Sequence, residues 1–392
     1  MRKYGLVGKK LSYSYSKIIH TFLIEYYNLS AVYDLIEVDF IDSKLLAQYD
    51  GLNITIPYKA DVIPFLQKNL SPIAAVNTIL KNGDELIGYN TDIIGFSYLV
   101  EKLAITDIKK IVILGSGASS KMVAHFFADA EIIVISRNHP QYNYEYLQTI
   151  TADLLINTTP VGMDAYDSPI PSELLTHYRG IIDINYNPLN SKLGMDAKKQ
   201  NIPYINGLYM LIIQAVRAFE IWFELSVDPS VVEEIYYHIC FLTHPKIALI
   251  GMPMSGKTTA ITAFFGCDLD DQIIKRSGEK IADMLDRGTF RRAESRTLQA
   301  LVNEGHKLIA LGGGAILNFE NLEIIKDYLI IFLNTPLEVL QKRIQTDTRP
   351  LLKKKGDLEK LYEKRIPLYK QYANITIETN ELEAKLNEYF NN

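Results

Sequence analysis

Short apolar runs alternate with longer amphipathic stretches from the start of the chain. Strands are predicted at 4–8, 32–38 and 51–56, and helices at 17–27 and 43–48. Pro57 would end the third strand. AVNTIL and ELIGYNTD then predict a hairpin across a turn at 81–84, and the NTD at 90–92 is placed to cap a helix that begins near Ile93. This alternation of strands and helices is typical of a largely parallel α/β sheet.

From Lys109 onward the alternation becomes stricter. KKIVILGSGASSKMVAHFF predicts a strand, a glycine turn and a helix, and EIIVISRN predicts the next strand. Two further strands, ADLLINTTPVGM and RGIIDINYNP, end in small or polar residues. GLYMLIIQAVRAFEIWFEL and VDPSVVEEIYYHI predict amphipathic helices. The pattern favours a dinucleotide-binding fold, in which the ligand lies beyond the carboxyl ends of the strands.

The glycine turn of this second part gives a partial fingerprint. Gly115 and Gly117 fit G-x-G-x-x-G, whereas the third position is Ser120. At the end of the next strand, where an NAD-binding fold offers an acidic residue, the chain has Ser-Arg-Asn at 136–138. The charge and fork geometry of Arg137 suit the 2′-phosphate of NADP, and the alternative is a solvated loop arginine.

A new domain is predicted to begin near Lys246. The apolar run IALI enters a loop that fits G-x-x-x-x-G-K-[ST], after which a helix is predicted to open at Thr259. Glycines in such a loop let backbone N–H groups surround nucleotide phosphates, the lysine reaches the β/γ oxygens, and the threonine hydroxyl ligates Mg²⁺. The predicted phosphate-binding residues are Gly251, Met254, Ser255, Gly256, Lys257, Thr258 and Thr259.

Composition narrows the functional classes. A chain of 392 residues is long enough for two or three domains, and 48% hydrophobic with 22% charged residues is ordinary for a soluble globular protein. A net charge of −5 argues against nucleic acid or an anionic membrane as a partner. Cys240 and Cys267 have no metal or redox spacing, and the apolar stretch 208–225 is interrupted by polar residues. We therefore expect a cytoplasmic protein with no membrane span.

Residues 1–240 resemble shikimate dehydrogenases. The motifs that carry the resemblance are SYS at 14–16, NITIPYK at 53–59, AVNT at 75–78, NTD at 90–92, LGSGASS, ISRN, NTTPVGM, DINYNP and GLYMLIIQA. The resemblance implies reduction of 3-dehydroshikimate to shikimate with NADPH. It also implies that Lys59 is the proton donor and that Asp92 holds Lys59 and the substrate hydroxyls in place.

The same resemblance assigns the binding residues of this half. The substrate carboxylate falls to Ser14 and Ser16, and the ring hydroxyls to Asn53, Thr55, Asn77, Tyr186 and Gln214. The cofactor residues are Gly115, Gly117, Ala118 and Ser119 at the pyrophosphate, Ser136, Arg137 and Asn138 at the 2′-phosphate, and Ile184 and Gly207 at the nicotinamide. Lys17 stands where this family commonly has proline.

The remainder resembles shikimate kinases through the phosphate loop, DLD at 268–270, TFRRAE at 289–294, LGGGA at 311–315, TRPLL at 348–352 and KRIPLY at 364–369. This implies transfer of the ATP γ-phosphate to the shikimate 3-hydroxyl. The implied roles are Mg²⁺ binding for Asp268 with Thr258, catalysis for Asp270 and Lys257, substrate binding for Arg291, Gly313 and Arg365, and nucleotide binding for Arg349. Because few residues separate Lys257 from Asp268, a short helix is expected after the loop.

Together these features predict an α/β protein with three domains: a substrate domain (1–93 with 208–240), an NADP-binding Rossmann domain (94–207) and a P-loop kinase domain with a parallel sheet (246–392). The predicted activity is bifunctional, with NADP(H), ATP and Mg²⁺ as cofactors. Three alternatives remain: a kinase-like half that only binds nucleotide as a regulatory module, a P-loop switch for a protein partner, and a quinate dehydrogenase that uses NAD. The sequence leaves the oligomeric state open.

Overall fold

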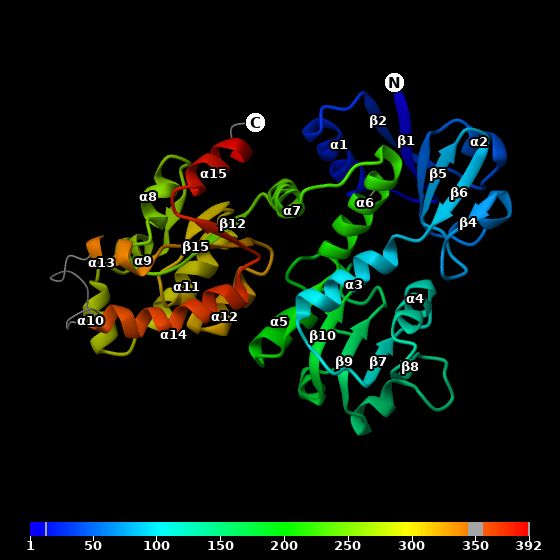
Figure 1. The fold of residues 1–392 in the computed structure, drawn as a ribbon. Coiled ribbons are helices and arrows are strands. Elements are labelled where there is room, and N and C mark those ends of the chain that lie inside the picture. Colours follow the sequence, from blue (N-terminus) through cyan, green and yellow to red (C-terminus); the bar gives the residue numbers. More distant parts are fainter. Residues whose placement is uncertain (12–13, 344–355, 391–392) are drawn as a thin grey trace. The chain divides into compact units, whose positions relative to one another are not determined.

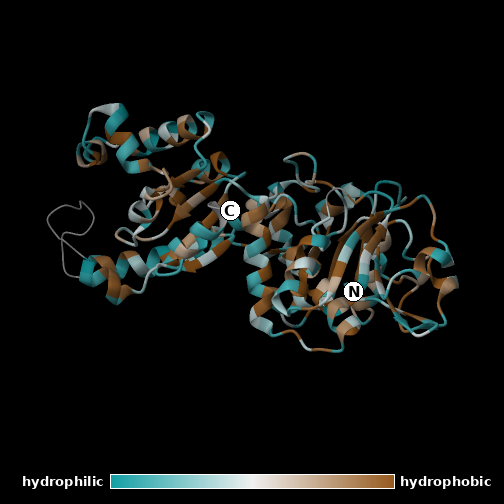
Figure 2. Cartoon of the chain, turned by 90° about the horizontal axis from the view of Figure 1, so that it is seen from above, coloured by the Kyte–Doolittle hydropathy of each residue, from teal (hydrophilic) through white to brown (hydrophobic). Residues whose placement is uncertain are grey.

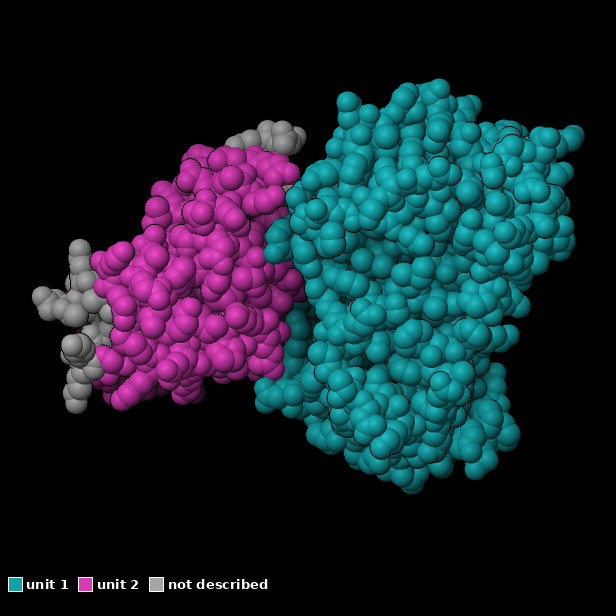
Figure 3. Space-filling model, viewed as in Figure 1, with its two compact units in different colours: residues 1–239 teal, residues 240–392 magenta. Residues whose placement is uncertain are grey.

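The computed structural model describes the backbone of residues 1–11, 14–343 and 356–390 (Figure 1). The chain divides into two compact units, Met1–Ile239 and Cys240–Asn392 (Figure 3). The described residues form two sheets in the first unit and one in the second. The predicted TRPLL segment with Arg349 lies outside the described residues.

The first sheet of unit 1 has the strand order β2-β1-β3-β5-β6-β4. Its strands are β1 (Arg2–Gly8), β2 (Ala31–Glu37), β3 (Gly51–Ile54), β4 (Lys68–Asn69), β5 (Thr78–Asn82) and β6 (Glu85–Tyr89). β1 runs parallel to β2 and β3, whereas β5 pairs antiparallel with β3 and β6. β3 is two residues shorter than predicted, because the chain turns before Pro57, with the Tyr58 N–H bonded to the Thr55 carbonyl.

The second sheet of unit 1 is parallel throughout, in the order β11-β10-β9-β7-β8. Its strands are β7 (Lys110–Leu114), β8 (Glu131–Ile135), β9 (Ala152–Asn157), β10 (Tyr178–Asp183) and β11 (Tyr204–Asn206). Successive residues of β7 enter different cores: Val112 and Leu114 pack on one face, and Ile111 and Ile113 on the other. A strand buried on both faces is apolar at every position, which explains the continuous run KIVIL. Figure 2 shows the apolar colouring of the central strands.

The helices of unit 1 are α1 (Ser16–Tyr26), α2 (Ser43–Ala47), α3 (Asp92–Leu103), α4 (Ala118–Phe126), α5 (Lys192–Lys199), α6 (Leu208–Phe223) and α7 (Pro229–Thr243), the last of which continues past the division between the units. The sequence pattern predicted neither α5 nor β11. Ser191 caps α5 by accepting the Gly194 N–H at 3.2 Å. As expected from NTD, the Asn90 side chain accepts the Ile93 N–H at 3.3 Å at the start of α3.

Unit 2 contains a parallel sheet in the order β13-β14-β12-β15-β16. Its strands are β12 (Ile247–Ile250), β13 (Cys267–Asp268), β14 (Leu308–Ala310), β15 (Leu329–Asn334) and β16 (Ile375–Glu378). Its described helices are α8 (Lys257–Thr262), α9 (Leu269–Ser277), α10 (Ile281–Asp286), α11 (Phe290–Asn303), α12 (Phe319–Ile324), α13 (Leu337–Arg343), α14 (Asp357–Tyr372) and α15 (Leu382–Phe390). The helix after the phosphate loop is short, as expected, but it begins at Lys257 and not at Thr259, because the left-handed Gly256 already turns the chain into the helix.

Within the described ranges, none of the helices combines the length and the apolar character needed to cross a bilayer.

Candidate functional site

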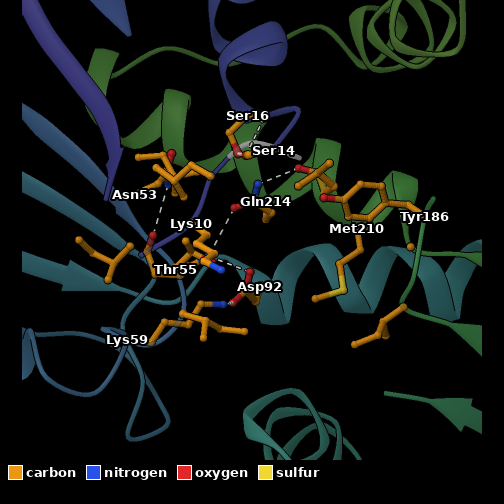
Figure 4. A pocket seen from close by; sticks show the side chains of 18 of the residues that line it. Lys10, Ser14, Ser16, Asn53, Thr55, Lys59, Asp92, Tyr186, Met210 and Gln214 are labelled. Carbon is orange, nitrogen blue, oxygen red and sulfur yellow. Dashed lines mark hydrogen bonds and ion pairs between the residues drawn. The ribbon is translucent and has the colours of Figure 1, made fainter. Parts of the chain in front are cut away.

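A cavity of about 420 Å³ in unit 1 collects every residue predicted for the substrate and the nicotinamide (Figure 4). These residues are Ser14, Ser16, Asn53, Thr55, Lys59, Asn77, Asp92, Ile184, Tyr186, Gly207 and Gln214. They come from β3, from the segments after β1, β3 and β10, from the residue before β5, and from α1, α3 and α6 with its N-cap. The fold thus brings segments separated by more than 150 residues to one pocket.

Lys59 and Asp92 form the charged pair of this cavity. The Lys59 Nζ lies 2.6 Å from the Asp92 Oδ2, and the two side chains are 24% and 17% exposed. Asp92 is the first residue of α3, where the helix N-terminus favours a carboxylate. The pair leaves a lysine ammonium beside the cavity at a fixed position, as a proton donor requires.

Amide side chains connect this pair to the rest of the pocket. Asn77 Nδ2 lies 2.9 Å from Asp92 Oδ1 and 3.4 Å from Gln214 Oε1. Asn53 also lines the cavity, but its amide group forms hydrogen bonds within the protein. The Asn53 Nδ2 donates to the Thr78 hydroxyl at 3.1 Å, and the Asn53 Oδ1 accepts from the Tyr33 hydroxyl at 2.8 Å. Asn53 therefore supports the neighbouring strand as well as facing the pocket.

Ser14 and Ser16 meet at the start of α1. The Ser14 hydroxyl donates to the Ser16 hydroxyl at 3.1 Å and accepts the Ser16 N–H at 3.2 Å. The ring of Tyr186 lies 5.4 Å from that of Tyr15, and burial raises the pKa of Tyr186 to about 12. Tyr186 is therefore a neutral hydroxyl at physiological pH, suited to hydrogen bonding.

Ile184 and Gly207 bring two backbones together at the end of β10. A Cβ added at Gly207 would overlap the Ile184 carbonyl group, so only glycine permits this approach. Both residues line the cavity, so backbone atoms form part of its wall.

The predicted dinucleotide residues lie at one edge of the second sheet. Leu114 pairs with Ile135, so the loops that follow β7 and β8 leave the sheet together, and the Gly115 N–H donates to the Ile135 carbonyl at 2.8 Å. Gly115 has φ +102°, and an added Cβ would lie 2.8 Å from the Thr158 hydroxyl. This tight turn leads into α4, whose N-cap, Gly117, has no side-chain acceptor for the first-turn N–H groups.

These features fit a dinucleotide phosphate. Ala118 and Ser119 open α4, and uncapped N–H groups at a helix N-terminus bind phosphate. Ser136 and Asn138 flank Arg137, which is exposed and makes no ion pair with any described residue. The guanidinium is therefore available for a second phosphate.

The phosphate loop of unit 2 lines a separate cavity of about 560 Å³. Positive φ angles at Gly251, Met254 and Gly256 shape the loop. Lys257 Nζ donates to the Gly251 carbonyl at 3.0 Å and to the Ser255 hydroxyl at 3.2 Å. A buried ammonium inside a ring of loop atoms suits phosphate oxygens.

The magnesium prediction also has a geometric counterpart. The Thr258 hydroxyl donates to Asp268 Oδ2, which places two hard oxygen ligands together beside Lys257 and Thr259 in this cavity. Mg²⁺ prefers oxygen ligands and keeps waters and phosphate oxygens in its other positions, so the pair fits the ion. The described residues hold no cluster of three or more His, Cys, Asp or Glu side chains arranged for a metal.

Three successive glycines after β14 each face one predicted catalytic or substrate residue. A Cβ added at Gly312 would lie 2.6 Å from Asp270 Oδ1. A Cβ added at Gly313 would lie 3.1 Å from Arg365 Nη1, and a Cβ added at Gly314 would lie 2.5 Å from Arg291 Nη2. The side chains of Asp270, Arg291 and Arg365 therefore pack against the glycine loop, which has no space for side chains of its own residues. They come from three helices, α9, α11 and α14, in that order.

A buried carboxylate holds one of these arginines. Arg291 Nη1 lies 2.7 Å from Glu294 Oε2, and the Glu294 side chain is 1% exposed. Burial raises the pKa of Glu294, and Arg291 opposes this effect. Glu294 is the last residue of the TFRRAE motif, and the sequence predicted no role for it.

Other pocket residues were given no role by the sequence analysis. Lys10, Met163, Met210 and Leu211 line the cavity of unit 1, and Arg343, Thr379 and Glu383 line that of unit 2. Arg343 donates from Nη1 to the Met254 carbonyl at 3.1 Å. In the sequence, a lysine or arginine in a loop or at a helix end cannot be distinguished from a solvated surface residue. Only the fold shows that it lines a cavity.

Each unit places a glycine turn at the carboxyl end of a parallel strand and carries a polar cavity, which defines a nucleotide-dependent α/β enzyme with an oxidoreductase part and a phosphotransferase part. Residues 6–79 match the family model for the shikimate dehydrogenase substrate binding domain, and residues 255–391 match the model for shikimate kinase. The chain belongs to the shikimate dehydrogenase family and carries a shikimate kinase domain in its C-terminal unit.

Named relatives support the first assignment. A shikimate dehydrogenase (NADP⁺) of Clostridium beijerinckii is 34% identical over 262 residues, covering 60% of this chain and 97% of the relative. The Pyrococcus abyssi enzyme is 33% identical over 256 residues with the same coverage. A crystal structure of shikimate dehydrogenase 1 from Peptoclostridium difficile has a TM-score of 0.55 at 34% identity and covers 61% of this chain and 98% of its own.

A structure of the Thermus thermophilus enzyme in complex with NADP(H) and shikimate matches with a TM-score of 0.54 at 29% identity, and covers 60% of this chain and 98% of its own. The α/β fold class predicted from the sequence is confirmed, as is the family resemblance of both parts. The individual site residues stay predictions.

Proposed function

We propose that this chain is a bifunctional enzyme that reduces 3-dehydroshikimate to shikimate with NADPH and then phosphorylates shikimate with MgATP. The main supporting observation is the Lys59–Asp92 pair inside a pocket that also holds the predicted hydroxyl-binding amides. The shikimate kinase domain of unit 2 supports the second activity. The relatives named as NADP⁺ enzymes, together with Arg137, favour NADP over NAD.

In the reductase, the bound cofactor supplies hydride to the substrate ketone, and negative charge grows on the ketone oxygen. Lys59 stands beside the cavity and donates the proton to that oxygen. Asp92 orients the Lys59 ammonium, while Asn77 and Gln214 bind ring hydroxyls. Ser14 and Ser16 hold the carboxylate end, and the backbone wall of Ile184 and Gly207 receives the nicotinamide ring.

In the kinase, Asp270 orients the 3-hydroxyl of shikimate toward the γ-phosphate, and Lys257 stabilises negative charge on the phosphate oxygens. Arg365 and Arg291 bind the carboxylate, and Gly313 binds a ring hydroxyl through its backbone. Thr258 and Asp268 hold Mg²⁺, which neutralises phosphate charge when bound.

The test is a coupled assay on the full chain. NADPH oxidation is followed with 3-dehydroshikimate, and ADP release is followed with shikimate and MgATP. Both signals are expected, each dependent on its own substrate.

A kinase-like unit that binds ATP without shikimate-dependent ADP release would establish the alternative of a regulatory module. ATP or GTP hydrolysis that ignores shikimate would favour the P-loop switch. Turnover of quinate with NAD in preference to shikimate with NADP would favour the third alternative.

A further inference from the structure

We infer that Lys10 is a specificity-determining residue of the unit 1 pocket: its ammonium group binds the substrate carboxylate and selects acids over neutral analogues. This inference rests on the proposed reductase function. The family resemblance gave the carboxylate only to two serines, so Lys10 adds a charge that had no assigned role.

The first observation is that, within the part of the chain that the structure describes, one of the two positively charged side chains of the pocket is paired and the other is not. Among the described residues that line it, the positively charged ones are Lys10 and Lys59. Lys59 is held by Asp92 at 2.6 Å, whereas Lys10 forms neither a hydrogen bond nor an ion pair with any described residue. Figure 4 shows Lys10 among the same group of side chains as Thr55 and Asp92.

The second observation is the charge balance of the described lining. Lys59 and Asp92 cancel, which leaves Lys10 as the net positive charge. A substrate that carries one carboxylate brings the complex to neutrality. Without Lys10 the described lining would offer no net positive charge to the carboxylate, which would lose part of its hydration on binding without compensation.

The third observation is the backbone around Lys10. The Lys9 N–H donates to the Ile56 carbonyl at 3.4 Å, and the Leu11 N–H donates to Glu37 Oε1 at 2.7 Å. These bonds connect Lys9 to the segment that follows β3, and Leu11 to the last residue of β2. The same β1–α1 connection carries Ser14, whose N–H donates to the Leu11 carbonyl at 2.9 Å. Lys10 and Ser14 therefore present an ammonium and a hydroxyl to the same cavity, a combination that suits a carboxylate.

The test compares Lys10→Met, which keeps the aliphatic stem, with Lys10→Arg, which keeps the charge. Lys9→Met is the matched control, because Lys9 is also exposed but does not line the cavity. Calorimetric titration of each full-length variant measures binding of shikimate and of shikimate methyl ester, and the data are fitted to two sites because unit 2 is also proposed to bind shikimate. Lys10→Met is expected to weaken shikimate binding about tenfold and leave the ester nearly unchanged. Lys10→Arg and Lys9→Met are expected to keep the wild-type preference for the acid.

An unchanged acid-to-ester ratio in Lys10→Met would overturn the inference. A loss of NADPH binding with shikimate binding intact would also overturn it, because it would place Lys10 at the cofactor. Circular dichroism checks folding, and Lys10→Gln serves as the second variant if Lys10→Met is unstable. Since binding is measured without turnover, a wild-type protein that binds shikimate but does not oxidise it with NADP⁺ would count against the proposed function and still test Lys10.

Discussion

Replacing Lys59 with methionine removes the proposed proton donor and keeps most of its aliphatic volume. The Lys59 Nζ lies 2.6 Å from Asp92 Oδ2, and Asp92 Oδ1 keeps a separate bond from Asn77 at 2.9 Å. The substitution should therefore leave Asp92 anchored and the pocket open. The loss is expected in the chemical step and not in the fold.

The expected size follows from the role of the lysine. A positioned general acid contributes about 10²- to 10⁴-fold in rate. At about 1.4 kcal/mol per tenfold change, this is roughly 3–5 kcal/mol of transition-state stabilisation. The kcat for NADPH-dependent reduction of 3-dehydroshikimate should fall by about 10²- to 10⁴-fold, because water is a poorly positioned substitute donor.

The assay follows NADPH absorbance at saturating substrate, and cofactor fluorescence reports NADPH affinity separately. NADPH affinity should stay unchanged, because the phosphate-binding edge belongs to the other sheet of unit 1. Shikimate-dependent ADP release should also persist, because unit 2 has its own phosphate loop. Lys68→Met, on the exposed strand β4, is the control. A kcat within about threefold of wild type would refute the role of Lys59, and so would a loss explained by NADPH affinity alone.

Three further substitutions test other parts of the proposal. Arg137→Ala should raise the KM for NADPH at least about tenfold and leave the KM for NADH nearly unchanged, because only NADPH carries the 2′-phosphate; equal effects would contradict this role. Asp270→Asn should reduce shikimate-dependent ADP release by about 10²-fold or more while the reductase rate is kept, and retained kinase activity would exclude Asp270 as the group that orients the hydroxyl. Gly207→Ala should lower the free energy of unfolding by about 1–3 kcal/mol, since the new Cβ meets the Ile184 carbonyl; thermal denaturation measures this, and an unchanged melting temperature would show that the backbone can move apart.

The sequence indicated the residues that belong to contiguous motifs. Lys59 and Asp92 stood in NITIPYK and NTD, and the P-loop was complete within one stretch. Other features carried no local signal. The helix α5 has only eight residues, few of them apolar, and Lys10 resembles any loop lysine. The role of Glu294 depends on its burial beside Arg291, which no spacing reveals.

The chain by itself determined the order of most strands and helices, the two glycine turns and the family motifs, because these depend on local periodicity and on backbone conformations that glycine permits. Only the tertiary structure decided which polar groups meet. Lys59 and Asp92 are 33 positions apart, and Asn77 reaches Gln214 across 137. Lys59 and Asp92 meet because β3 and β6 end at the same edge of the first sheet, and Asn77 joins them because antiparallel β5 starts at that edge, with α6 beside it. Hydrogen bonds and charge balance within a pocket are properties of that assembled edge, not of any single segment.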